Sequence, residues 1–143
     1  MDGSVDGVYL PLRSTRLSRP VVMWRVPAGF PSPAEDYVEG RIDLNRDLIK
    51  HPLATFYVRV AGDSMEPRIH AGSLLVVDRT VETKDDDIVV ARLADGLCVK
   101  RLRVGQGGRI VLISENPGYD PVEVMEGMDF EVWGRVMYSI QRH

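Results

Sequence analysis

The sequence of 143 residues contains little cysteine and no long apolar run. Its one cysteine, Cys98, excludes an internal disulfide framework and any cysteine-rich zinc site, and it fits a reducing compartment. The longer apolar runs, such as 74–77 and 88–91, fall far short of the roughly 20 residues that a membrane helix needs. The N-terminus carries Asp2 and Asp6 and lacks the basic start and apolar middle of a signal peptide. We therefore expect a soluble, cytoplasmic protein without membrane association.

The chain also lacks an excess of positive charge, because its 18 basic and 21 acidic side chains give a formal net charge of -3. This balance argues against a strongly basic nucleic-acid-binding protein, and we expect no direct sequence-specific binding to DNA. A chain of this length can bury one sizeable core. All but three of the basic residues are arginine, so any lysine that does chemistry is Lys50, Lys84 or Lys100.

Proline, in contrast, is concentrated at the start of the chain, where the first 33 residues hold five of the nine prolines. Proline removes a backbone donor and restricts the residue before it, so this segment cannot form a regular helix. We expect an extended arm over residues 1–33, with a short strand around 21–26. The arm carries four basic and two acidic side chains, a charge of +2, and the remaining 14 basic and 19 acidic side chains give -5. The sequence thus predicts an arm, 1–33, followed by a single domain, 34–143.

Two helix signals follow the arm. Ser32-Pro33-Ala34-Glu35 has the form of a capping box with proline at the first helical position, which predicts a helix start that Gly40 then weakens. Asp43 can cap a second short helix over 44–49, and His51-Pro52 ends it. We expect one or two short helices in all.

From residue 55 onward, short β-rich runs alternate with turn residues. Asp95-Gly96 predicts a hairpin between two of these runs, and the glycine cluster at 105–108 predicts another turn. Six short strands with little helix indicate a compact, mainly β domain, either a sandwich or a partly closed barrel. The expected strands are 55–60, 73–78, 88–93, 97–104, 109–113 and 130–140.

Histidine offers no convincing catalytic base or metal ligand. His51 stands at a helix stop, His143 is the last residue, and neither these nor His70 has the spacing of a metal-ligand set. A surface or capping role is favoured for each, so we expect no Ser-His-Asp triad, no metal and no cofactor.

Ser64 follows a predicted strand on a turn that contains Gly62. The hydrolase elbow pattern Gly-x-Ser-x-Gly fails at its last position, because Glu66 stands where glycine is required. Taken alone, an ordinary turn serine is therefore the favoured interpretation of Ser64.

Lys100 changes this balance. In a strand over 97–104, the period of two places Lys100 on the same face as Cys98 and Leu102. Desolvation on that face disfavours the ammonium form, so we expect a lowered pKa for Lys100 and a neutral amine available as a general base. The alternative is a lysine that extends past Leu102 into water. Cys98 is expected to be a small packing residue near the site rather than a nucleophile.

Ser64, Lys100 and their surroundings together resemble the peptidase domain of the LexA/UmuD-type self-cleaving serine-lysine peptidases. Within that family the resemblance is closer to the UmuD mutagenesis proteins than to LexA-type repressors, because the short, proline-rich arm cannot hold a helix-turn-helix domain. The segments that carry the peptidase resemblance are 62–65, 71–78, 87–91 and 99–102, and those similar to the UmuD cleavage region and the helix after it are 28–38 and 41–45.

The resemblance implies a role for each site residue. Ser64 would attack the carbonyl of Ala28, and Lys100 would take the hydroxyl proton and return it to the amine of Gly29. The backbone amides of Asp63 and Ser64 would form the oxyanion hole.

The resemblance also implies partners. Family members are homodimers whose cleavage is stimulated by the RecA filament on single-stranded DNA in the SOS response, and the cut form is an accessory subunit of a UmuC-type translesion polymerase. A second hypothesis is a non-proteolytic or vestigial-peptidase binding module that scaffolds a polymerase or regulator. Neither hypothesis assigns a role to residues 1–10.

Overall fold

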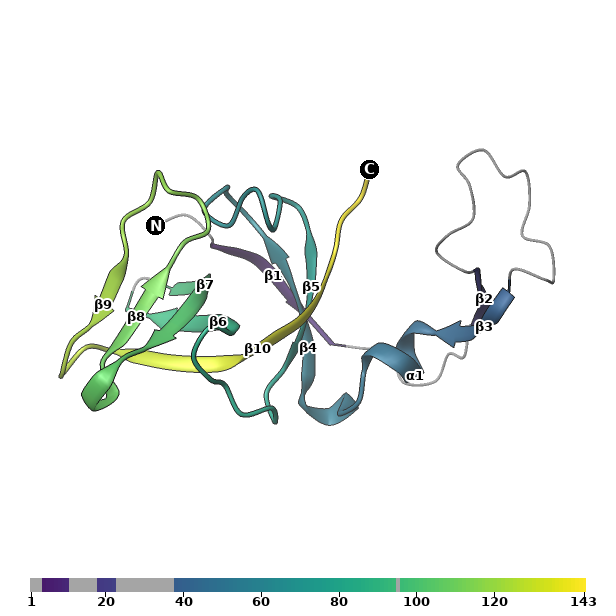
Figure 1. Cartoon of the computed structure of the whole chain (residues 1–143), viewed down its shortest axis with the longest axis horizontal. Coiled ribbons are helices and arrows are strands. Elements are labelled where there is room, and N and C mark those ends of the chain that lie inside the picture. Colours follow the sequence, from purple (N-terminus) through teal and green to yellow (C-terminus); the bar gives the residue numbers. More distant parts are fainter. Residues whose placement is uncertain (1–3, 11–17, 23–37, 95) are drawn as a thin grey trace.

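The computed structural model describes residues 4–10, 18–22, 38–94 and 96–143. They form an eight-stranded antiparallel sheet in the order β1-β4-β5-β10-β6-β7-β8-β9 and a two-stranded sheet of β2 and β3 (Figure 1). The strands are β1 (Val5–Tyr9), β2 (Ser18–Val22), β3 (Val38–Asp43), β4 (Thr55–Val60), β5 (Leu74–Asp78), β6 (Ile88–Leu93), β7 (Gly96–Val104), β8 (Ile110–Ile113), β9 (Val122–Val124) and β10 (Phe130–Ile140). The helices are α1 (Leu44–Leu48) and the single 3-10 turns η2 (Pro52–Ala54) and η3 (Gln106–Gly108).

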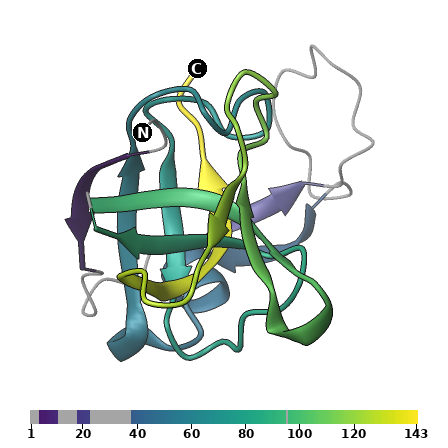
Figure 2. The ribbon, with the colours of Figure 1, turned by 90° about the vertical axis from the view of Figure 1, so that its left-hand side faces the viewer.

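The large sheet folds over on itself, so that β4 and β5 cross β6 and β7 (Figure 2). The long strand β10 joins the two halves, because it pairs with β5 and with β6. Its register shifts next to Gly134, where a side-chain Cβ would lie only 2.9 Å from the carbonyl oxygen of Asp78. The expected mainly β domain of short, bent strands is confirmed, and the sheet remains open between its end strands β1 and β9.

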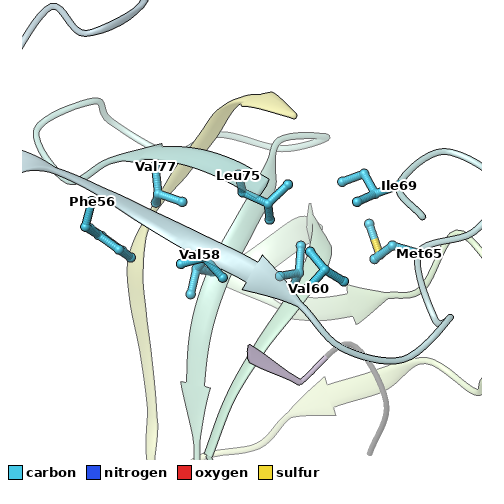
Figure 3. Close-up of a cluster of buried hydrophobic side chains, with 9 residues drawn as sticks. Phe56, Val58, Val60, Met65, Ile69, Leu75 and Val77 are labelled. Carbon is cyan, nitrogen blue, oxygen red and sulfur yellow. The ribbon is translucent and has the colours of Figure 1, made fainter. Parts of the chain in front are cut away.

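A buried apolar cluster lies where the two halves of the sheet meet. Phe56, Val58 and Val60 alternate along β4 and point into this cluster, as the period of two in a strand requires (Figure 3). Met65 and Ile69 join them from the turn that follows β4, and both are almost completely buried. The turn after β4 is therefore anchored in the core by its own side chains.

All six strands expected in the domain are present, three of them with the expected bounds. The predicted hairpin joins β6 to β7, with Leu93 opposite Gly96, and Asp43 caps α1 by accepting from the amide of Asn45 at 3.0 Å. Three strands were not expected, namely β1, β3 and β9. Strand β9 has only three residues, β1 lies in the segment expected to be an extended arm, and β3 lies where a helix was expected.

The prediction of a helix after the capping box is wrong for residues 38–43, which are described. Val38–Asp43 is the strand β3, which pairs with β2, although the box itself, 32–35, lies outside the described residues. The local helix signal was weak, because Gly40 interrupts it, and pairing with β2 satisfies the same backbone groups. The arm strand expected at 21–26 is observed as Ser18–Val22, with 23–26 outside the described residues.

No helix in the described ranges combines the length and the apolar composition needed to cross a membrane.

Asp78 connects the end of β5 to the segment that precedes β4. It is only 4% exposed, accepts from the amide and hydroxyl of Thr80 at 2.8 and 2.6 Å, and lies 2.6 Å from Nδ1 of His51. Burial alone would raise the pKa of Asp78, but the hydrogen bonds from Thr80 and His51 outweigh burial and hold this pKa below its ordinary value of 3.8.

We expect Asp78→Asn to lower the free energy of unfolding by about 1–3 kcal/mol near neutral pH, because a charge-assisted acceptor is lost. The difference from wild type should be fully present above the ordinary carboxyl pKa and should shrink as the pH falls through the lowered pKa of folded Asp78. Urea unfolding at a series of acidic pH values measures it, with the exposed Asp120→Asn as the control. A difference that stays constant on acidification would contradict the assignment.

Candidate active site

Ser64 lies on the turn that leaves β4. Gly62 has a φ of 77°, a left-handed conformation that favours glycine, and it redirects the chain immediately before Ser64. The turn is closed behind Ser64 by the hydrogen bond from the amide of Gly72 to the carbonyl of Val60, at 2.8 Å. Since Met65 is fully buried in the core, the position of Ser64 is fixed from both sides.

Lys100 lies near the middle of β7 and is only 2% exposed, on the same strand as the buried Cys98 and Leu102. Its amine nitrogen donates to Ser64 Oγ at 3.1 Å and to Ser114 Oγ at 2.7 Å. The expected burial of Lys100 is therefore confirmed, and the alternative of a side chain that reaches water is excluded. The fold brings together Ser64 and Lys100, which are far apart in the sequence.

Two effects act on the charge of this amine. Burial removes water from the ammonium group and favours the neutral amine. The ring of Tyr119, whose centroid lies 5.7 Å from Nζ, acts in the opposite direction by attracting a cation. A neutral amine in this position has a lone pair within hydrogen-bonding distance of the Ser64 hydroxyl, which is the geometry that a general base needs.

Ser114 was not expected from the sequence. It follows the end of β8 and is 8% exposed, and the pairing of Arg101 with Ile113 places Ser114 opposite Lys100. The signal that could have found it is the register of the predicted hairpin around 105–108, since that register decides which residue faces Lys100.

The loop after Ser114 holds the Ser64 turn. Asn116 donates from its amide to the carbonyl of Ser64 at 2.9 Å and from Nδ2 to the carbonyl of Asp63 at 3.1 Å. The hydroxyl of Tyr119 donates to Asp63 Oδ1 at 2.5 Å. This loop, too, was missed, because Asn116 and Tyr119 act through backbone groups that leave no spacing pattern in the sequence.

Ion pairs of Glu115 connect strand β7 to the turn after Ser64. Glu115 pairs with Arg101 on β7 and lies 3.6 Å from Arg68, which belongs to the turn after Ser64. The strand that carries Lys100 and the turn that carries Ser64 are thus connected through one carboxylate.

The amides expected to form the oxyanion hole belong to Asp63 and Ser64. Among the described residues neither amide donates a hydrogen bond, whereas both carbonyls accept one from Asn116. Neither amide is therefore engaged by another described group, as a donor in an oxyanion hole requires.

The remaining candidates are not brought into the site. Ala28 and Gly29 lie outside the described residues. His51 and His70 are at the surface beside Asp78 and Glu66, and within the described ranges no group of three or more His, Cys, Asp or Glu side chains could hold a metal ion. Cys98 is buried, as expected for a packing residue.

Comparison with known proteins gives one matching family model and three similar relatives. A family model described as Peptidase S24-like matches residues 20–137. The chain is 46% identical to Protein SamA of Salmonella typhimurium over 110 residues, which are 76% of this chain and 75% of that protein. It is 39% identical over 129 residues to Protein MucA of Escherichia coli, covering 88% and 86% of the two chains. The LexA repressor of Xylella fastidiosa is 39% identical over 131 residues, which are 91% of this chain and 61% of the repressor.

Tyr119→Phe tests how firmly the Ser64 turn is held. The variant loses the hydrogen bond to Asp63, which is worth about 1 kcal/mol, so amide hydrogen exchange at 62–66 should become about fivefold faster. Hydrogen exchange followed by mass spectrometry measures it, and the exposed Tyr138→Phe on β10 is the matched control. Equal exchange in the two variants would show that Tyr119 does not hold the turn.

Proposed function

Because this chain belongs to the Peptidase S24-like family, we propose that it is a self-cleaving serine peptidase with Ser64 as nucleophile and Lys100 as general base. The membership agrees with the LexA/UmuD-type resemblance of the sequence. The observation that carries the proposal is the buried hydrogen bond between Lys100 Nζ and Ser64 Oγ. A lysine without access to water costs stability, and a reactive role gives a physical reason for its burial beside a serine.

The proposed substrate is the Ala28–Gly29 bond of the chain itself. Ser64 Oγ attacks the carbonyl carbon of Ala28 while its proton passes to Lys100 Nζ, and the amides of Asp63 and Ser64 stabilise the oxyanion. The carbon–nitrogen bond then breaks, and Lys100 delivers the proton to the amine of Gly29. Water attacks the resulting ester with Lys100 again as base, which releases the carboxylate of Ala28 and regenerates Ser64.

Ser114 has a positioning role in this proposal. Its hydroxyl accepts from Lys100 Nζ at 2.7 Å, which restricts the rotation of the lysine and aims its lone pair at Ser64. The small residues at the cleavage site also fit the mechanism. Gly29 lets the backbone bend, and Ala28 needs only a shallow pocket.

The biological role proposed is that of a UmuD-like SOS mutagenesis protein. Its similarity to SamA and MucA over most of their lengths supports this role. The arm, 1–33, would supply the cleavage site, and the domain, 34–143, would act as a cytoplasmic homodimer. A RecA filament on single-stranded DNA would stimulate the cut, and the cut form would be an accessory subunit of a UmuC-type translesion polymerase.

Ser64→Ala and Lys100→Ala should each fold and fail to release residues 1–28. We expect the cleavage rate to fall by about 10³-fold or more, since the nucleophile or its base is lost. Intact-mass spectrometry during incubation at alkaline pH, with and without a RecA filament, measures it. The exposed Ser139→Ala and Lys84→Ala are matched controls that should cut like wild type. Cleavage at Ala28–Gly29 in either active-site variant would refute the mechanism, and an uncut wild type would favour the non-proteolytic binding module.

The unaided rate should rise with pH. Only the neutral form of Lys100 can accept the Ser64 proton, so the rate should increase by up to about tenfold per pH unit until the lysine is deprotonated. A pH series of cleavage rates tests this, with circular dichroism of Ser64→Ala to show that the fold persists. A rate that is flat through the alkaline range would argue against Lys100 as the base.

A further inference from the structure

The N-terminal strand β1 occupies a backbone edge that leads to Ser64. It pairs antiparallel with β4, with Val5 opposite Val60 and Tyr9 opposite Tyr57. Its N-terminal end continues this pairing, because the carbonyl of Ser4 accepts from the amide of Ala61 at 2.8 Å. Ala61 lies three positions before Ser64, so the end of β1 lies beside the nucleophile turn.

The same segment also reaches the strand that carries Lys100. Strand β8 pairs with β7 only from Arg101 to Val104, which leaves the neighbouring edge of β7 without β8 at Cys98. Ser4 fills this position through an antiparallel bridge with Cys98. A single short segment, 4–10, therefore covers the edge of β4 that precedes Ser64 and the edge of β7 that precedes Lys100.

An extended substrate that reaches Ser64 would find backbone partners at these two edges. A peptide that presents a carbonyl to Ser64 Oγ continues as an extended chain beside the residues that lead into the site, and its own backbone groups need partners there. Each edge can pair with one strand at a time. A cleavage segment paired at these edges and a docked segment 4–10 would therefore exclude each other.

Strand β1 makes few apolar contacts with the core, so it can be exchanged for another strand. Among its described side chains, only Val5 packs against the core cluster, while Val8 and Tyr9 on β1 and the following Leu10 are 46%, 49% and 80% exposed. Its register is irregular between Val5 and Gly7. Near its far end, Val8 and Leu10 border a hollow of about 190 Å³ rather than a packed interface. An edge strand with so little buried apolar area can leave without opening the core.

We propose that residues 4–10 are an exchangeable occupant of the strand site from which the cleavage segment is presented to Ser64, and that this occupant slows self-cleavage until it leaves. This inference rests on the proposed function. It gives residues 1–10 a regulatory role, in which anything that draws β1 off the sheet favours the cut.

Deletion of residues 1–10 tests the proposal directly. The shortened chain should cut at Ala28–Gly29 about fivefold faster or more, because the docked population of β1 no longer blocks the site. A synthetic peptide of residues 1–10 should return the rate toward that of the full chain. The control is the same peptide with Gly7→Pro and Val8→Pro, which lacks two backbone donors and should have no effect. An unchanged or slower rate in a folded deletion variant would overturn the proposal.

Two further measurements keep the test decisive. If the deletion variant does not fold, the full chain with Val8→Pro weakens β1 at an exposed position and should also cut faster, and an unchanged rate there would count against the proposal. The second measurement needs no cleavage. In a Ser64→Ala chain that lacks residues 1–10, a fluorescent peptide of residues 23–34 should bind, and the peptide of residues 1–10 should displace it. If wild type never cuts, the proposed function fails, whereas the absence of displacement refutes competition alone.

Discussion

The hydrogen bond between Lys100 and Ser64 is the contact on which the other features of the site depend. It joins a strand from one half of the folded sheet to a turn from the other half, so it exists only because the core holds the two halves in register. Met65 anchors the turn by its burial in the core, and Ser114 holds the Lys100 amine by a second hydrogen bond. The site is thus an interior contact of the fold rather than a group of surface residues, and its geometry is preorganised by packing.

Burial of Lys100 has two consequences. It reduces stability, because an amine is withdrawn from water, and it favours the neutral amine, which can accept a proton, over the ammonium form. Two hydroxyl oxygens and the face of Tyr119 accompany the buried amine. The loop 114–119 supplies Ser114 and Tyr119 and also holds the carbonyls of Asp63 and Ser64. One loop therefore contacts both Lys100 and the turn that carries Ser64.

Much of this arrangement could be predicted from the sequence, and the rest depends on long-range register. Alternation along 97–104 predicted a buried Lys100, and turn residues predicted Ser64 beyond the end of a strand. Ser114 could not be identified in this way, because its relation to Lys100 depends on how β7 pairs with β8. Strand β1 was missed for a related reason. Its partner β4 is about fifty residues away in the chain, and a segment containing Gly7 has little strand propensity of its own. The helix expected from the capping box failed where pairing between β2 and β3 overrode a local signal.

A pH titration of Lys100 tests most directly whether its neutral amine is the general base. With Lys50→Arg and Lys84→Arg, Lys100 is the only lysine in the chain, so ¹⁵N-lysine labelling gives a single side-chain signal that NMR can follow through a pH titration in Ser64→Ala. We expect the pH at which this signal reports loss of the proton to coincide with the midpoint of the rise in cleavage rate of the same protein with Ser64 restored. A Lys100 that is still protonated at a pH where cleavage has already reached its maximum would contradict it.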